Sequence, residues 1–388
     1  MSDIAAAAAA IAAARPQPAE QLVADVDRPA LTLEQFHRLL QAGVQHGASD
    51  IHFRVGDPPT YRVHGKLVQM NLPKLRMSDT KVLCEYVVAE PTARAEIATL
   101  QEHDTSYSLP GVSRFRVNVF RQRGSMSLIL RIIPSSVPTI EGLGLPEVIR
   151  TISEYERGLV LVTGATGSGK SSTLAAMINH VNQNRRCHIL TIEDPIEFIH
   201  RNVKASVSQR EIGIDTRNYN IALRAALRQD PDVILVGEMR DAESVDIALK
   251  ASETGHMVFS TVHTPDAAKT VNRLVSVFPA EEQQNVRYRL ADSLKATVSQ
   301  RLIPKPDGKG RIAACEIMIV TMTVQDYLRD PSRSGGLKDV IEQGHNQYHM
   351  QSFDQDLARL VREKKITFEA ARQNASNPGD LERAMRFE

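Results

Sequence analysis

A short glycine-rich segment, Gly164–Ser171, carries the residue types that bind phosphate. It reads Gly-Ala-Thr-Gly-Ser-Gly-Lys-Ser and matches the pattern G-x-x-x-x-G-K-[ST] at every position. Its glycines allow backbone N–H groups to turn toward phosphate oxygens, because no Cβ atom stands in the way. The lysine would reach the β- and γ-phosphates, and Ser171 would bind Mg²⁺. We predict nucleotide contacts from Gly164, Ala165, Thr166, Gly167, Ser168, Gly169, Lys170, Ser171 and Ser172.

The sequence around this loop argues against the alternative, a glycine-rich surface turn. An apolar run, Gly158–Thr163, precedes the loop, and the helix-like segment Ser172–Ile178 follows it. A helix that begins at a phosphate adds partial positive charge from its N-terminus. Strand, loop and helix together therefore predict a nucleotide cradle.

An acidic turn follows a second apolar run. His188–Ile192 is followed by Glu193-Asp194-Pro195-Ile196-Glu197, where the proline would end the strand. Ligands of open α/β sheets bind at the carboxyl ends of the strands. The three carboxylates are therefore candidates to hold Mg²⁺ or to orient an attacking water. An acidic surface turn without function is the alternative.

A third apolar run ends in a single carboxylate. In the segment Asp232–Glu238, an aspartate begins the strand and Glu238 follows Gly237 at its end. An aspartate is the usual residue at this position, so the longer glutamate suggests a contact with Mg²⁺ through water. The alternative is a structural carboxylate that caps the next helix.

Two histidines bracket a fourth apolar run, Met257–Val262. His256 precedes this run and His263 follows it, between two threonines. A histidine at a strand end can sense a γ-phosphate or hold a metal-bound water. A hydrogen-bonded structural histidine is the commoner case for each, and no third ligand has a spacing suited to a histidine-bound metal.

Arginines alternate with apolar residues in the segment Ser113–Arg121. Strand periodicity places Arg114 and Arg116 on one face, and Arg131 lies in the next predicted strand. These arginines could neutralise phosphate charge, either within one chain or from a neighbouring subunit. A solvated strand face is an equally good explanation. Nucleic-acid binding is a weaker one, because 47 basic and 46 acidic residues leave little net charge.

The elements that must position these residues form two domains. A capping box at Thr32 and apolar residues at helical spacing predict a helix that Gly47 ends, followed by several strands. We predict an α/β protein with this boundary scheme: an Ala- and Pro-rich disordered tail at 1–30, an α+β domain at 31–133, a linker at 134–146 and a nucleotide-binding domain at 147–388. The second domain should contain buried parallel strands at Leu159–Val162, His188–Ile192, Pro231–Val236 and His256–Val262. Beyond Pro265 the pattern is mostly helical and includes a long predicted helix at Ala280–Gln300.

Composition restricts the class of protein further. The 388 residues are 42% hydrophobic and 24% charged, as in globular soluble proteins. Three widely spaced cysteines argue against a zinc site or a disulfide scaffold and suit a reducing cytosol. No apolar run reaches the ~18–20 residues of a membrane span, and the alanine tract near the N-terminus lacks the basic flank of a secretion signal.

The ordered motifs resemble those of type IV pilus retraction ATPases of the PilT/PilU type, within the secretion ATPase superfamily. The resemblance extends from about Leu33 to Phe387. It rests on the phosphate loop together with the preceding stretch Gly158–Thr163, and on six further segments: Gly47–His52, Arg114–Asn118, Leu190–Phe198, Asp230–Arg240, Glu253–His256 and Thr261–Thr264.

This resemblance implies a PAS-like N-terminal domain, a RecA-like ATPase domain and a ring of six subunits that binds ATP and Mg²⁺. Nucleotide would sit between the two domains, with arginines contributed across the ring. Glu197 would polarise water, with Glu193 as its competitor, while Glu238 would be the Walker B acid and Asp194 metal-directed. His256 and His263 would form a histidine box. The implied setting is the cytoplasmic face of the bacterial inner membrane. A pilus platform protein is the implied partner, with a paralogous retraction ATPase as a further candidate, and nucleic acid is not expected to bind.

Two departures bear on the type of motor. Extension and type II secretion ATPases carry an extra N-terminal domain and a four-cysteine metal site, which this sequence lacks, so retraction is favoured. Core retraction enzymes carry Ala-Ile-Arg-Asn-Leu-Ile-Arg-Glu where Thr323–Asp330 reads Thr-Val-Gln-Asp-Tyr-Leu-Arg-Asp. Together with the extended C-terminal tail, this segment looks more like the accessory paralogue. Three readings stay open: a core or accessory retraction motor, a nucleotide-gated module that docks on a partner motor, and a secretion or DNA-translocation ATPase.

Overall fold

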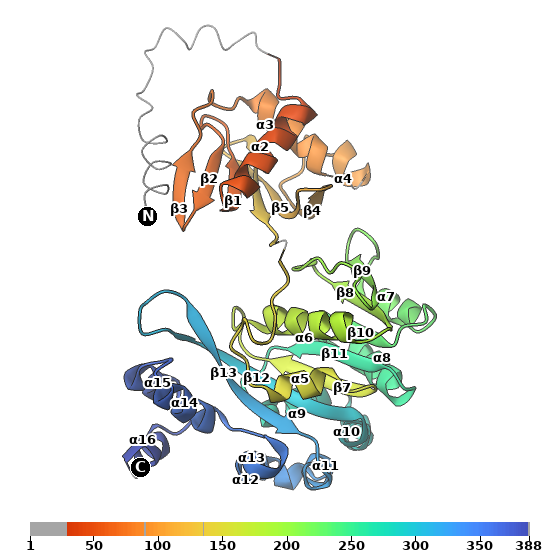
Figure 1. Ribbon diagram of the computed structural model, residues 1–388. Coiled ribbons are helices and arrows are strands. Elements are labelled where there is room, and N and C mark those ends of the chain that lie inside the picture. Colours follow the sequence, from red (N-terminus) through yellow and green to blue (C-terminus); the bar gives the residue numbers. More distant parts are fainter. Residues whose placement is uncertain (1–28, 89–90, 135, 387–388) are drawn as a thin grey trace. The chain divides into compact units, whose positions relative to one another are not determined.

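The computed structural model describes residues 29–88, 91–134 and 136–386. The chain divides into two compact units, Met1–Ser135 and Ser136–Glu388, and each is described by itself (Figure 1). Most of the tail predicted to be disordered lies outside the described residues. Among those that are described, no helix has the length and hydropathy needed to cross a membrane.

The N-terminal unit is built on an antiparallel sheet with the strand order β3-β2-β1-β6-β5-β4. Its strands are β1 (Ala48–Phe53), β2 (Thr60–Val63), β3 (Lys66–Gln69), β4 (Glu102–Leu109), β5 (Ser113–Gln122) and β6 (Ser125–Ile132). Its helices are α2 (Leu33–Gln45), α3 (Met77–Val87) and α4 (Pro91–Ala95).

The apolar core of this unit explains its layers. Phe36 and Leu40 of α2 are buried against Phe53 of β1 and Phe115 of β5, so helices cover one face of the sheet (Figure 1). The capping box predicted at Thr32 is present, since its hydroxyl accepts the Gln35 N–H and the Gln35 side chain accepts the Thr32 N–H. Alternation along the strands sends the polar residues of β5 to the opposite face.

The C-terminal unit contains a seven-stranded sheet with the order β13-β12-β7-β11-β10-β8-β9. All neighbouring strands run parallel except β13, which is antiparallel to β12 at one edge. The strands are β7 (Gly158–Thr163), β8 (His188–Glu193), β9 (Ser206–Glu211), β10 (Val233–Val236), β11 (Met257–Val262), β12 (Leu294–Pro304) and β13 (Arg311–Ile319).

Helices cover both faces of this sheet (Figure 1). Residues that alternate along β7 enter two separate cores: Leu159 and Leu161 face one, and Val160 and Val162 face the other. The first core is shared with α7 (Tyr219–Ala226), α8 (Ala242–Glu253), α9 (Ala267–Ser276) and α10 (Ala280–Ser293), and the second with α5 (Val148–Ser153) and α6 (Lys170–Asn184). Burial on both sides explains why these strands read as continuous apolar runs.

The helix predicted at Ala280–Gln300 is wrong in its last third. The helix α10 ends at Ser293, and the chain continues as strand β12, which pairs with β7. A second unpredicted strand, β13, returns antiparallel to it. Short apolar runs do not distinguish a buried strand from a helix, and here pairing with the central strand decides the outcome.

Helices dominate the rest of the chain, as predicted. They are α11 (Met322–Arg329), a 3₁₀ helix (Pro331–Gly336), α12 (Leu337–Gln343), α13 (His345–Tyr348), α14 (Phe353–Arg362), α15 (Phe368–Asn374) and α16 (Pro378–Arg386). Leu357 and Leu360 of α14 pack with Ile303 and Ile312 of the β12–β13 hairpin. This small core attaches the C-terminal helices to the long hairpin (Figure 1).

Candidate nucleotide-binding site

Four strand ends bring the predicted chemistry to one edge of the C-terminal sheet. Parallel pairing aligns Thr163 with Val262, and Val236 with Ile192. The residues that follow these positions therefore gather at the same edge. They are the phosphate loop after β7, Glu193 at the end of β8, Glu238 after β10 and His263 after β11.

The backbone of the phosphate loop explains its glycines. Gly164, Gly167 and Gly169 have φ angles of +142°, +77° and +92°, a region that side chains disfavour. At Gly164 a Cβ atom would also lie 2.5 Å from the Ser168 hydroxyl and 2.6 Å from the Gln300 carbonyl oxygen. The loop therefore needs glycine at this position for two reasons, its dihedral angle and its close packing on β12.

The side chain of Lys170 is buried and folds back onto the backbone of its own loop. Its ammonium donates to the carbonyl oxygens of Gly164 and Ala165, each across 2.9 Å. Burial lowers the pKa of Lys170, and the charge of Glu238 opposes that shift. Next to it, Ser171 stands exposed in the first turn of α6. The first two residues of α6 are therefore the cationic Lys170 and the exposed hydroxyl of Ser171, at a helix N-terminus that faces the loop.

The Glu238 carboxylate lies between two side chains at this edge, Arg240 and His263. One carboxylate oxygen lies 2.5 Å from the Arg240 guanidinium, and the other lies 3.5 Å from Nε2 of His263. Burial is the main cause that lowers the pKa of His263, and the charge of Lys170 adds to it. A neutral imidazole at this point can either donate or accept a hydrogen bond.

The carboxylates of the acidic turn differ in burial: Glu193 is largely buried, whereas Asp194 and Glu197 are exposed. Glu193 accepts hydrogen bonds from the Thr191 hydroxyl at 2.6 Å and the Gln209 amide at 3.2 Å. Burial raises the pKa of Glu193 despite these bonds. Glu193 is thus held by the neighbouring strand β9, whereas Glu197 is open to water.

His256 does not lie with the other predicted site residues of the C-terminal unit. It precedes β11, whereas His263 follows β11, so the strand separates them by roughly 20 Å at ~3.3 Å per residue. Its Nδ1 lies 3.0 Å from the Ala251 carbonyl oxygen and 3.1 Å from the Thr254 hydroxyl. The strand between the two histidines places His263, and not His256, at the edge that carries the phosphate loop, and the predicted role of His256 in a histidine box stays a prediction.

The predicted arginines all lie in the N-terminal unit. Register places Arg116 of β5 directly beside Arg131 of β6, and Arg131 donates to Asp50 across 2.9 Å. Arg114 donates to the hydroxyls of Ser106 and Ser108 on β4. The expected shared face is present, and Arg116 and Arg131 are exposed on it.

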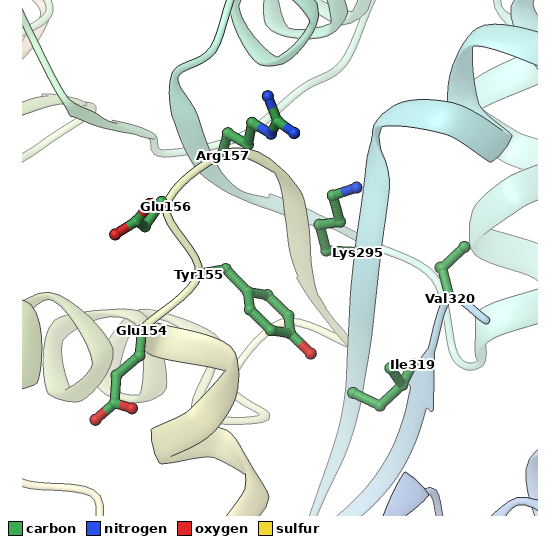
Figure 2. A pocket seen from close by; sticks show the side chains of 7 residues that line it. All are labelled: Glu154, Tyr155, Glu156, Arg157, Lys295, Ile319 and Val320. Carbon is green, nitrogen blue, oxygen red and sulfur yellow. The ribbon is translucent and has the colours of Figure 1, made fainter.

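A hollow of about 560 Å³ lies away from these strand ends (Figure 2). It is lined by Glu154, Tyr155, Glu156, Arg157, Lys295, Ile319 and Val320. These residues surround the beginnings of β7 and β12, at the edge of the sheet opposite the phosphate loop. The hollow is therefore separate from the predicted phosphate site.

The fold brings two further residues to this region that no sequence motif indicates. Tyr219, the first residue of α7, lies against Gly237, and Glu316 of β13 lies beside Ser299, which accepts a hydrogen bond from Thr163. Neither belongs to a motif. A tyrosine and a glutamate in otherwise ordinary segments give no signal until the strands are assembled.

Comparison with known proteins identifies the relatives of this chain. The family model described as "Type II/IV secretion system protein" matches residues 27–378. The type IV pilus retraction ATPase PilT of Pseudomonas aeruginosa is 47% identical over 340 residues, covering 88% of this chain and 98% of PilT. The type IV pilus ATPase PilU of the same organism is 39% identical over 347 residues, covering 89% of this chain and 90% of PilU.

A solved structure agrees with the fold. The crystal structure of the pilus retraction motor PilT with bound ADP superposes with a TM-score of 0.81 at 42% identity. The match covers 91% of this chain and 99% of that one. The predicted fold class, an α+β N-terminal domain followed by an α/β phosphate-loop domain, is confirmed.

Proposed function

The chain belongs to the type II/IV secretion ATPase family, as an ATPase of the PilT/PilU retraction type, and from that premise we propose that it hydrolyses ATP to power retraction of type IV pili and twitching motility. The observation that carries the proposal is the convergence of Lys170, Glu238 and His263 at the strand ends around one phosphate loop. Binding and hydrolysis of a triphosphate require this combination of cation, carboxylate and water-orienting groups.

The loop residues supply binding. The backbone N–H groups of Gly164–Ser171 would surround the phosphates, and Lys170 would exchange its two loop carbonyls for β- and γ-phosphate oxygens. The exposed hydroxyl of Ser171 would bind the Mg²⁺ that accompanies these phosphates. Together these groups would hold the γ-phosphate in place for in-line attack.

The donor set fits Mg²⁺ as the implied cofactor. Among the described residues, no three His, Cys, Asp or Glu side chains are grouped as a metal site. Mg²⁺ typically keeps several waters and binds through one or two protein oxygens plus substrate phosphates. Ser171 and Glu238 would hold it, with Asp194 as a further candidate, and bound Mg²⁺ would neutralise charge on the transferring phosphoryl group.

The acidic turn would supply the carboxylate that polarises water. Glu197 is exposed and free to face an attacking water, whereas Glu193 is occupied by Thr191 and Gln209. We assign the role to Glu197 and keep Glu193 as its competitor. His263 beside Glu238 would orient the same water or sense the γ-phosphate.

The assembly that we propose is a ring of six subunits at the cytoplasmic face of the inner membrane. Arg114, Arg116 and Arg131 would neutralise phosphate charge, within a chain or across the ring, and the exposure of Arg116 and Arg131 supports this role. A pilus platform protein would receive the force. Nucleic acid is not an expected partner, because basic and acidic residues balance.

Two observations bear on core and accessory roles. Identity is higher to PilT, at 47%, than to PilU, at 39%, which supports the core motor. The stretch Thr323–Asp330, most of it in α11, departs from the core-type sequence, which keeps the accessory role as the second candidate. Deleting the gene separates the two roles. Hyperpiliated, non-motile cells indicate a core motor, and normal piliation with weakened force indicates an accessory one.

The test of the activity itself is phosphate release by the purified chain. Lys170→Ala should abolish turnover, because Lys170 is the only positively charged side chain in the loop Gly164–Ser171. Lys309→Ala, in the exposed turn between β12 and β13, is the matched control and should turn over as wild type does. Equal rates for all three proteins would contradict the assignment.

A further inference from the structure

Gly237 leaves a space that the Tyr219 hydroxyl fills. A Cβ atom on Gly237 would lie 2.8 Å from the tyrosine oxygen, 3.3 Å from the Ile192 carbonyl oxygen and 3.5 Å from Cα of Glu193. The end of β10 also contacts the end of β8 directly, since the Gly237 N–H donates to the Ile192 carbonyl across 2.8 Å. The phenol oxygen therefore lies beside the ends of β8 and β10, where Glu193 ends β8 and Glu238 follows β10.

The helix α7 determines this placement. Tyr219 is its first residue, and the Asn218 side chain caps the helix by accepting the Ile221 N–H at 2.9 Å. Ala222 and Leu223 are buried in the core beneath the sheet, and the tyrosine packs against the same core. The cap and this packing hold the helix start, so the ring has little freedom to swing away.

The surroundings of the phenol keep it protonated. Burial raises the pKa of Tyr219, and the charges of Asp194, Glu238 and Glu193 raise it further, while Arg240 opposes them. A protonated phenol is a hydrogen-bond donor. The phenol has one proton to donate, and any one of these three carboxylates can accept it; a hydrogen bond to a charged acceptor is stronger than one to a neutral acceptor.

We propose that Tyr219 is a positioning residue of the hydrolytic centre, whose hydroxyl donates its one hydrogen bond to a strand-end carboxylate, that of Glu193, Asp194 or Glu238, and holds it in the orientation that serves the attacking water. This inference rests on the proposed site of hydrolysis at these strand ends. It adds a residue from α7 to a centre otherwise built from the strand ends. It also gives a reason for glycine at position 237, since any side chain there would displace the hydroxyl.

Tyr219→Phe tests the hydroxyl alone, because the ring and its packing are kept. We expect kcat to fall about tenfold or more, the loss typical of a hydrogen bond to a charged group, with KM for ATP and the Kd of a fluorescent ATP analogue within about twofold of wild type. The thermal midpoint should stay unchanged. Tyr288→Phe, a half-exposed tyrosine on α10, is the control and should behave as wild type.

A double-mutant cycle with Gly237→Ala measures the contact itself. In the wild-type background the new methyl group meets the hydroxyl at 2.8 Å, and kcat should fall. In the Tyr219→Phe background that oxygen is gone, so the same alanine should cost much less. Additive losses in kcat would show that the two positions do not act through one contact.

The outcomes distinguish this inference from the proposed function. If Lys170→Ala is inactive while Tyr219→Phe retains wild-type kcat and an unchanged thermal midpoint, the ATPase site stands and the tyrosine proposal is overturned. If Tyr219→Phe instead raises KM or weakens nucleotide binding with kcat unchanged, the residue supports binding, and the positioning role is equally refuted. If Lys170→Ala retains wild-type turnover, the proposed site fails first.

Discussion

The carboxylate of Glu316 accepts the backbone N–H of Ala267 across 2.8 Å, which joins strand β13 to the first turn of α9. The Ser299 hydroxyl lies 3.4 Å from the same oxygen, and Ser299 accepts the Thr163 hydroxyl at 3.0 Å. A buried chain of hydrogen bonds therefore extends from the strand before the phosphate loop to the helix that follows His263. Burial raises the pKa of Glu316 to about 7.

This raised pKa makes stability depend on pH in a defined direction. Between pH ~4.5 and ~7 the folded state holds a proton on Glu316 that the unfolded state has released, so stability falls as pH rises through this window. Glu316→Gln keeps an acceptor for Ala267 but cannot titrate. We expect it to be more stable than wild type at pH 8 by roughly 1–3 kcal/mol, and nearly equal to wild type at pH 5.

Urea denaturation at the two pH values measures this difference. Glu281→Gln, an exposed glutamate in the first turn of α10, is the control and should follow the wild-type pH dependence. The same pH dependence in Glu316→Gln as in wild type would show that the buried carboxylate is not the titrating group.

Two glycines of the phosphate loop should respond differently to alanine. Both have positive φ angles, which costs roughly 1–2 kcal/mol for a residue with a side chain. Only at Gly164 does the new Cβ also collide, with Ser168 and the backbone of Gln300, whereas at Gly167 nothing lies within 4 Å. Gly164→Ala should therefore weaken ATP binding at least about tenfold more than Gly167→Ala does. Titration with a fluorescent ATP analogue provides the measurement, and equal losses would rule out the packing argument.

Substitution of Glu197 should affect kcat, whereas substitution of Glu193 should affect stability. Glu197→Gln should lower kcat by about 100-fold or more with little change in thermal midpoint, because an exposed carboxylate contributes to water activation and not to packing. Glu193→Gln should alter stability, because Glu193 accepts bonds from Thr191 and Gln209. Single-turnover hydrolysis and thermal unfolding test both. The reverse pattern would make Glu193 the water-polarising carboxylate.

The separation of the two histidines predicts unequal roles. His263→Ala should lower kcat, since the imidazole lies 3.5 Å from Glu238. His256→Ala removes contacts to Ala251 and Thr254 at the end of α8, so it should lower the thermal midpoint and leave kcat nearly unchanged. Steady-state kinetics beside a thermal scan distinguish them. A large loss of kcat in stably folded His256→Ala would mean that this histidine serves a site in another subunit.

Mixing inactive subunits tests whether arginines act across the proposed ring. Arg116→Ala and Lys170→Ala should each lose turnover, and a mixture should recover part of it if one subunit supplies the loop and its neighbour the arginine. Assembly from denatured or dissociated subunits, checked by mass photometry, ensures that mixed rings form. Mixed rings no more active than their parents would assign the arginine to its own subunit.

The features that were predictable depend on short stretches of chain. The phosphate loop, the capping box at Thr32 and the apolar runs of β7, β8, β10 and β11 follow from local spacing, and the structure contains them. The end of α10 and the strands β12 and β13 were not predictable in this way. Whether Leu294–Ser299 continues a helix or pairs with β7 depends on a partner far away in the sequence.

By itself, the sequence determined that a glycine loop suited to phosphate opens a helix, because the dihedral freedom of glycine and the alignment of helix N–H groups are local properties. Only the tertiary structure decided which other residues reach that loop. Parallel pairing sends His263 toward it and His256 to the far edge, packing of α7 places Tyr219 over Gly237, and burial on β13 raises the pKa of Glu316. Each depends on contacts between residues distant in the chain, which no local pattern encodes.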